Sequence, residues 1–324
     1  MIMTGELLAE SSGYLGMGLV LILFGGDSLL RGLAGLAQRF GMSPFTAGVL
    51  LIAFPTSIPE LVVNAYAWQT GQIDLAFGNA IGSNIVNLTL TLAITALVTP
   101  LVIGMRVLAA ELVLILVATG AVLFFSLDGT IARWEGGLLL AGYFGFLAFF
   151  FRRGREESAA VQAELTEFAE TSTGMVQNLI RVAFAAVLLF FGAKFLVQGA
   201  PGVGQALGFG SMLTGLVIVA IATAIPEIVL LIMVARAGQS DIVAGHAFGA
   251  CLFNLLLMVG AMALLRPLAV PVSLVSLALP ATMALALVLL VLLRGDLRLG
   301  RRHGGVLLGL FVLWIVLACY PVWR

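Results

Sequence analysis

The sequence predicts an all-α integral membrane protein of ten transmembrane helices, arranged as two inverted five-helix repeats. Of its 324 residues, 61% are hydrophobic and 10% are charged, and the mean hydropathy is +1.16. This composition excludes a soluble globular protein. The chain also repeats itself, and its arginines gather in alternate connections between apolar segments.

Ten apolar segments are each long enough to cross a bilayer, which takes about 20 predominantly apolar residues. They cover residues 14–38, 43–69, 73–97, 105–127, 133–151, 176–200, 211–236, 241–265, 271–294 and 304–322. The connections are short, so a single membrane domain is expected. The longest polar stretch indicates a cytoplasmic linker, residues 152–175, between a first repeat (1–151) and a second repeat (176–324).

A shift of 167 residues aligns the second half with the first without a gap. Of the 78 residues in 24–101, 27 are identical to their partners. The alignment places Pro59-Glu60 over Pro226-Glu227, each pair inside an apolar segment. An ionisable residue within a span is costly and is by default a functional candidate. Duplicated, proline-interrupted spans indicate the binding site of a transporter.

The arginines predict the orientation. Most lie in or near the odd-numbered connections: Arg31, Arg39, Arg106, Arg152, Arg153, Arg155, Arg236, Arg294, Arg298, Arg301 and Arg302. By the positive-inside rule these connections are cytoplasmic, so both termini lie on the extracellular or periplasmic side of the cell membrane. Five spans per repeat then invert the second repeat relative to the first. The acidic start of the chain predicts no cleavable signal peptide.

The first copy of the motif predicts an interrupted helix. Pro55 and Pro59 cannot both lie in an unbroken helix, because each lacks an N–H donor and crowds the preceding turn. We expect a break at residues 53–57 and a new helix starting at Pro59. The freed carbonyls, the hydroxyls of Thr56 and Ser57, and the Glu60 carboxylate are the oxygen ligands that sodium and calcium prefer.

A polar stripe follows in the third segment, at a spacing of four residues along one helix face. It consists of Asn79, Ser83, Asn87 and Thr91, and its counterparts in the eighth segment are His246, Ala250, Asn254 and Met258. Each repeat thus offers a carboxylate beside an amide-bearing helix. The alternative is that these side chains only hold helices together. Two carboxylates can be neutralised by one divalent or two monovalent cations, the minimum for exchanging them.

At these residues the chain resembles the sodium/calcium exchanger family of the cation/calcium antiporter superfamily. The matching motifs are Pro55-Thr56-Ser57-Ile58-Pro59-Glu60 and Gly78-Asn79-Ala80-Ile81-Gly82-Ser83-Asn84, with their diverged copies in the second repeat. The resemblance implies alternating-access exchange of calcium for sodium. It implies ion binding by Glu60 and Glu227 with Thr56 and Thr223, a sodium site at Ser57 and Ser83, and a centre lined by Asn87 and Asn254.

The second copy departs from the family pattern. Ala224 and Ala250 stand where serines would bind a sodium ion. We therefore hypothesise that one sodium site is missing and that fewer than three sodium ions, such as an electroneutral two, exchange for each calcium, or that the coupling ion has changed.

Three intramembrane residues leave alternatives open. An unperturbed histidine side chain titrates near neutral pH, so His246 leaves a proton-coupled mode open, although a histidine that packs between helices is the simpler interpretation. A cation/proton exchanger on the same scaffold is therefore the alternative function. Asp27 and Lys194 occupy equivalent places, where they either pair across the repeat axis or each reach a cavity or interface alone.

Enzymatic activity is not predicted. Gly25-Gly26-Asp27 only weakly resembles an aspartyl protease motif and has no second copy, and no zinc, serine-histidine or nucleotide-binding motif is present. We expect no organic cofactor, no nucleic acid and no obligate protein partner. The expected partners are the lipid bilayer and the transported cations.

Overall fold

The structure is a computed structural model that describes residues 5–40, 57–102, 107–154, 173–271, 274–293 and 298–323. In the first half the elements are α1 (Gly5–Arg39), α3 (Ile58–Gln69), α4 (Ile73–Val86), η2 (Asn87–Thr91), α5 (Leu92–Val98), β1 (Leu101–Val102), α6 (Val107–Phe125), β2 (Thr130–Ile131) and α7 (Arg133–Gly154). The η elements are π-helical turns, and η2 joins α4 and α5 into one bent helix.

The second half begins with α9 (Met175–Ala206), α10 (Ser211–Leu213), η3 (Thr214–Val219) and α11 (Ala220–Arg236). It continues with α12 (Ser240–Leu252), η4 (Phe253–Met258), α13 (Val259–Leu265), β3 (Leu268–Ala269), η5 (Leu274–Ala278), α14 (Leu279–Leu292), β4 (Arg298–Leu299) and α15 (Arg301–Trp323). Helical residues thus occur within every apolar segment identified from the sequence.

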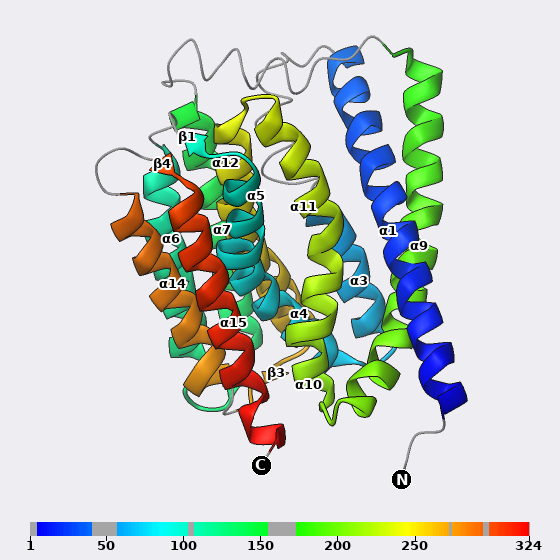
Figure 1. Ribbon diagram of the computed structural model, residues 1–324, viewed down its shortest axis with the longest axis vertical. Coiled ribbons are helices and arrows are strands. Elements are labelled where there is room, and N and C mark those ends of the chain that lie inside the picture. Colours follow the sequence, from blue (N-terminus) through cyan, green and yellow to red (C-terminus); the bar gives the residue numbers. More distant parts are fainter. Residues whose placement is uncertain are drawn as a thin grey trace.

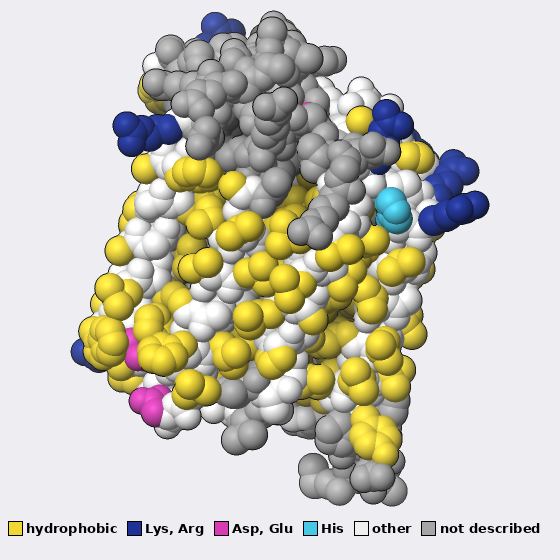
Figure 2. All heavy atoms as spheres, turned by 90° about the vertical axis from the view of Figure 1, so that its left-hand side faces the viewer, with side chains coloured by type: hydrophobic (Ala, Val, Ile, Leu, Met, Phe, Trp, Pro, Cys, Tyr) yellow, Lys and Arg dark blue, Asp and Glu magenta, His cyan; other side chains and the backbone are white. Residues whose placement is uncertain are grey.

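Six of the described helices are long and apolar enough to cross a membrane: Gly5–Ala37, Ile73–Val98, Met175–Ala206, Ser211–Arg236, Ser240–Leu265 and Arg301–Tyr320. Figure 2 shows a broad apolar belt around the middle of one face, with most of its Lys and Arg side chains at the upper end and its acidic side chains near the lower end. Such a belt is the surface that lipid requires. The expectation of an all-α membrane protein is confirmed at this level.

The two longest helices, α1 and α9, pack side by side at one edge of the molecule, and the other helices form a compact bundle beside them (Figure 1). The contacts within this pair are reciprocal. Gly32 of α1 meets Val182 and the Asn178 carbonyl, whereas Gly199 of α9 meets Leu15 and the Ser11 carbonyl. The shift of 167 residues pairs Gly32 with Gly199, Leu15 with Val182, and Ser11 with Asn178. The two contacts therefore use equivalent residues, as expected for two equivalent helices related by a twofold axis.

Two short β ribbons repeat this reciprocal pattern. Leu101 of β1 pairs with Leu299 of β4, and Leu268 of β3 pairs with Ile131 of β2, both antiparallel. Leu101 and Leu268 are repeat partners, so each ribbon joins one repeat to the other. The start of α1 and the end of α15 lie at the same end of the bundle (Figure 1).

The core is tightest where α4 crosses η3. A side chain on Gly82 would collide with the Leu216 carbonyl, and one on Gly215 would collide with the Leu75 carbonyl. Because backbone cannot yield as a flexible side chain does, Gly82→Ala should destabilise the fold by about 1–3 kcal/mol. Thermal unfolding of the detergent-solubilised protein measures this. Gly120→Ala, on α6 with nothing within 4 Å of the new methyl, should unfold no earlier than the unaltered protein, and equal midpoints for the two variants would contradict the argument.

Candidate cation-binding site

The two repeated glutamates meet in the interior of the bundle. Glu60 lies in the first turn of α3 and is 1% exposed, while Glu227 lies within α11 and is 5% exposed. Their carboxylates are close enough to repel each other. Neither oxygen of Glu60 has a donor in full hydrogen-bonding geometry, although the Ser83 and Asn254 side chains lie beside the carboxylate. Two acids brought together in a buried site are stable only with a proton or cation to offset the charge.

The local sequence explains where Glu60 lies. α3 begins at Ile58, with Pro59 as its second residue, where its missing N–H costs nothing. The helix thus starts within one residue of the predicted restart. Ser57 precedes it and is buried. Thr56 lies outside the described residues. The predicted break at residues 53–57 also lies outside them, except for Ser57.

In the second copy, the chain remains helical past Pro226. The π-helical turn η3 ends just before α11, and such turns frequently mark functional sites. The Thr223 hydroxyl is buried and donates to the Val219 carbonyl at 3.0 Å, so its oxygen retains lone pairs for another contact.

The predicted stripe on α4 forms a hydrogen-bonded row. Ser83 donates to Asn79 at 3.4 Å, and Asn79 donates to Asn64 of α3 at 2.9 Å. Thr91 donates to Asn87 at 3.3 Å, one turn of η2 away. The row therefore anchors α4 to α3, and the Ser83 hydroxyl also lies beside the Glu60 carboxylate.

The repeats contribute to each other's half of the site. Asn254, at the start of η4 in the second repeat, interacts with Glu60 of the first. It is fully buried, and neither its amide nitrogen nor its oxygen makes a hydrogen bond. An unsatisfied buried amide is costly, so its oxygen is available to a cation in the site, while its NH2 group is a donor suited to a carboxylate such as Glu60. The Asn87 amide nitrogen is likewise buried without a hydrogen bond.

His246 belongs to this site. Its Nε2 atom lies 3.3 Å from Oε2 of Glu227, and both side chains are buried. A protonated imidazole there would neutralise one of the two carboxylates, whereas a neutral imidazole would leave both charges to the cation.

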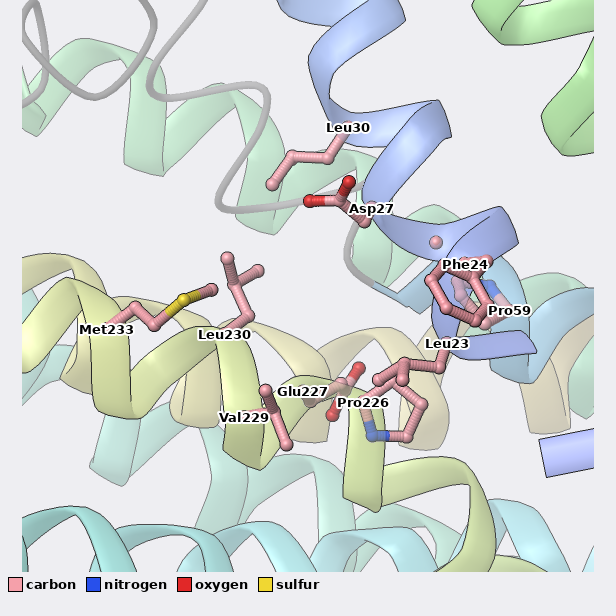
Figure 3. A pocket seen from close by; sticks show the side chains of 11 residues that line it. Leu23, Phe24, Asp27, Leu30, Pro59, Pro226, Glu227, Val229, Leu230 and Met233 are labelled. Atoms are coloured by element: carbon pink, nitrogen blue, oxygen red, sulfur yellow. The ribbon is translucent and has the colours of Figure 1, made fainter. Parts of the chain in front are cut away.

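A cavity of about 210 Å³ lies between α1 and α11 and reaches this site (Figure 3). Pro59, Pro226 and Glu227 line one part of it and Asp27 of α1 lines another. The space accommodates several water molecules. It connects the partly exposed Asp27 to the buried Glu227.

Asp27 does not pair with Lys194. It forms an ion pair with Arg31 one turn along α1, at 2.9 Å, and both side chains are about half exposed. The alternative of a pair across the repeat axis is therefore corrected, because a nearby arginine on the same helix is available to Asp27. Asp27 instead reaches a cavity, which was the other alternative. Lys194 is partly buried on α9.

Asn64 and Glu111 are among the buried polar residues that the sequence motifs did not reveal. Asn64 stands one turn after Glu60 on the same helix face, a spacing that could have identified it. Glu111 is the one acid in the fourth apolar segment and is fully buried. The cost of an intramembrane charge could have identified it, but it has no acidic partner in the second repeat, where Ala278 stands.

A pair of buried acids within an apolar helix bundle, beside proline-interrupted and π-helical turns, is the type of site that membrane cation transporters use. The family model described as "Sodium/calcium exchanger protein" matches residues 11–152 and 178–320, so the chain belongs to that family.

Curated relatives include the putative antiporter CaxA of Alkalimonas amylolytica, 31% identical over 91% of this chain and 94% of CaxA. The sodium/calcium exchanger MaX1 of Methanosarcina acetivorans is 24% identical over 94% and 97% of the two chains. A solved structure of the sodium-calcium exchanger NCX_Mj, soaked with sodium and strontium, matches with a TM-score of 0.67 at 24% identity, covering 95% of this chain and 98% of that one. The predicted family is confirmed, and the chain is a multi-pass membrane antiporter for cations.

Proposed function

We propose that the chain exchanges calcium for sodium across the cell membrane by alternating access. The observation that carries this proposal is the pair of buried acids, one from each repeat, that face each other. Among the described residues, no arginine or lysine forms an ion pair with either acid. One calcium or two sodium ions neutralise this pair, so the two cations compete for the same carboxylates. The names of the relatives, a putative antiporter and a sodium/calcium exchanger, support the same function.

The proposed site consists of the residues that the sequence predicts. Glu60 and Glu227 bind calcium or sodium. Ser57, Ser83 and Thr56 add oxygens in the first repeat and Thr223 in the second, while Asn87 and Asn254 line the centre. The cavity beside Asp27 is the route by which a cation reaches Glu227, and the Asp27 carboxylate attracts cations to it.

In the proposed topology, ten transmembrane helices form two inverted repeats with both termini outside. The reciprocal β ribbons and the reciprocal contacts of α1 and α9 support an axis that relates the repeats. The arginine-rich end in Figure 2 lies opposite the end that holds the termini in Figure 1, which supports their placement outside.

Uptake of calcium into vesicles tests the function directly. The purified chain is reconstituted, and uptake is driven either by a sodium gradient alone or by a pH gradient alone. We expect uptake with the sodium gradient. Uptake with only the pH gradient would replace the proposal by calcium/proton exchange, and uptake with neither would reject both.

Calcium/proton exchange is the second candidate because His246 lies against Glu227. The first repeat has an asparagine, Asn79, at the place of His246. If the His246 imidazole carries the coupling proton, His246→Asn removes that proton site. Under sodium/calcium exchange we expect His246→Asn to keep at least half of the sodium-driven rate and to retain the pH profile. Loss of pH-gradient-driven uptake in this variant would favour the proton mode.

A further inference from the structure

Glu111 is a third buried acid that the exchange site does not use. It lies near the start of α6, is fully buried, and neither of its carboxylate oxygens has a hydrogen-bond partner. An unpaired carboxylate in such surroundings is too costly to persist as an anion. It must therefore hold a proton or balance a nearby cation.

The neighbour that connects Glu111 to the site is Cys251 on α12. Cys251 is fully buried and interacts electrostatically with Glu111 and also with Glu60 and Glu227. Its thiol donates to the Asn84 carbonyl at 3.7 Å. Glu111 and the central pair thus share one neighbouring side chain, which puts them close enough to sense each other's charge.

The repeat shows that packing does not require this acid. The partner of Glu111 in the second repeat is Ala278, which is also buried, and the partner of Cys251 is Asn84. The scaffold therefore accommodates a methyl group at this place. The acid is therefore present in the first repeat alone. The second repeat also lacks two serines that the first repeat has, since Ala224 and Ala250 stand in their places.

Other ionisable groups on the elements packed against α6 are few. The elements α14, η4 and β2 carry none. Helix α12 carries Asp241, His246 and Cys251, and His246 is 3.3 Å from Glu227. Those on α7 are Arg133, Glu135, Tyr143, Arg152 and Arg153. Of these groups, Cys251 interacts electrostatically with Glu111.

We propose that Glu111 is a proton-binding site whose occupancy is antagonistic to cation binding at Glu60 and Glu227. A proton fits because it needs no further ligand, whereas sodium needs several oxygens, and neither Glu111 oxygen has a polar partner. A cation bound at the centre favours loss of the Glu111 proton to water. Conversely, a proton on Glu111 removes the negative charge of its carboxylate, which would otherwise stabilise the bound cation. As a general scale, Coulomb's law at an effective dielectric of about 20 gives on the order of a tenfold effect between any two unit charges separated by about 10 Å.

This inference rests on the proposed exchange for its first test. Sodium-driven calcium uptake is measured in vesicles between about pH 6 and pH 8. In the unaltered chain we expect the rate at limiting calcium to fall about tenfold toward the acidic end. In Glu111→Gln and in Glu111→Ala, which copies Ala278, we expect uptake to persist and the change to shrink below about twofold. Thr119→Val, which removes another buried polar group from α6, should keep the steep profile.

A second measurement does not depend on transport. Infrared spectroscopy of the solubilised protein at neutral pH detects the carbonyl stretch of a protonated carboxyl group. In the double variant Glu60→Gln/Glu227→Gln we expect one buried protonated carboxyl, and adding Glu111→Gln should remove it. A band that survives this third substitution overturns the proposal, and so does an unchanged pH profile in both Glu111 variants. If the unaltered chain takes up no calcium under any gradient, the exchange proposal fails, and the infrared band still decides the proton site.

Discussion

Replacing either central acid, by Glu60→Gln or Glu227→Gln, is expected to lower calcium transport by at least two orders of magnitude. The substitution preserves shape and removes one of the two charges that offset a divalent ion. The remaining carboxylate would face calcium with one uncompensated positive charge in a buried site. Breaking a buried charge pair in this way costs about 3–5 kcal/mol, and about 1.4 kcal/mol corresponds to a tenfold loss of affinity. Calcium uptake into vesicles under a sodium gradient gives the rates.

The control for this prediction is Asp128→Asn. Asp128 is exposed and accepts a hydrogen bond from the Thr130 backbone at 2.9 Å, which an asparagine oxygen also accepts. Its transport rate should match that of the unaltered chain. If Glu60→Gln and Glu227→Gln are folded, as judged by an unchanged elution profile, and still transport calcium within threefold of the normal rate, the two acids are not the ion ligands.

Much of the fold is predictable because lipid imposes strict rules. Long apolar segments must become helices, since a bilayer offers no partner for free backbone groups. These rules predicted the end of α1, the start of α9 and both ends of α15 to within a few residues. However, α1 begins earlier than predicted, at Gly5, and α9 extends further than predicted, to Ala206. The β ribbons and π-helical turns were not predictable, because two-residue strands and single extra turns leave no periodicity in the sequence.

The site was predictable where the repeat doubled the signal. Glu60, Glu227 and Asn254 are identified by position in the repeat, and the structure brings them together. Asp27 shows the limit of this reasoning: symmetry left open either a pair with Lys194 or a place in a cavity, and the structure has Asp27 in a cavity and paired with Arg31 of the same helix. Glu111 was missed for the opposite reason, because a residue that breaks the repeat carries no doubled signal.

The differences between the repeats also predict the stoichiometry. Ala224 and Ala250 are the partners of Ser57 and Ser83, and both alanines are buried. Without those two hydroxyls we expect the second repeat to bind no sodium ion of its own. Two sodium ions per calcium move no net charge. The unaltered chain should therefore exchange without a measurable current.

Restoring both serines, by Ala224→Ser with Ala250→Ser, should create the absent sodium site and make exchange electrogenic. A buried serine without a partner costs about 1–3 kcal/mol, but a helix offers the carbonyl four residues back, as Thr95 and Thr119 show in this protein. Each new oxygen then keeps its lone pairs for sodium. Recordings from supported membranes should show a current of one charge per cycle that requires both sodium and calcium, and the sodium dependence should steepen from second toward third order. Ala244→Ser, on the same helix α12 and equally buried, should stay silent. A current of the same size in the unaltered chain would show that its second repeat already binds a third sodium ion through other oxygens.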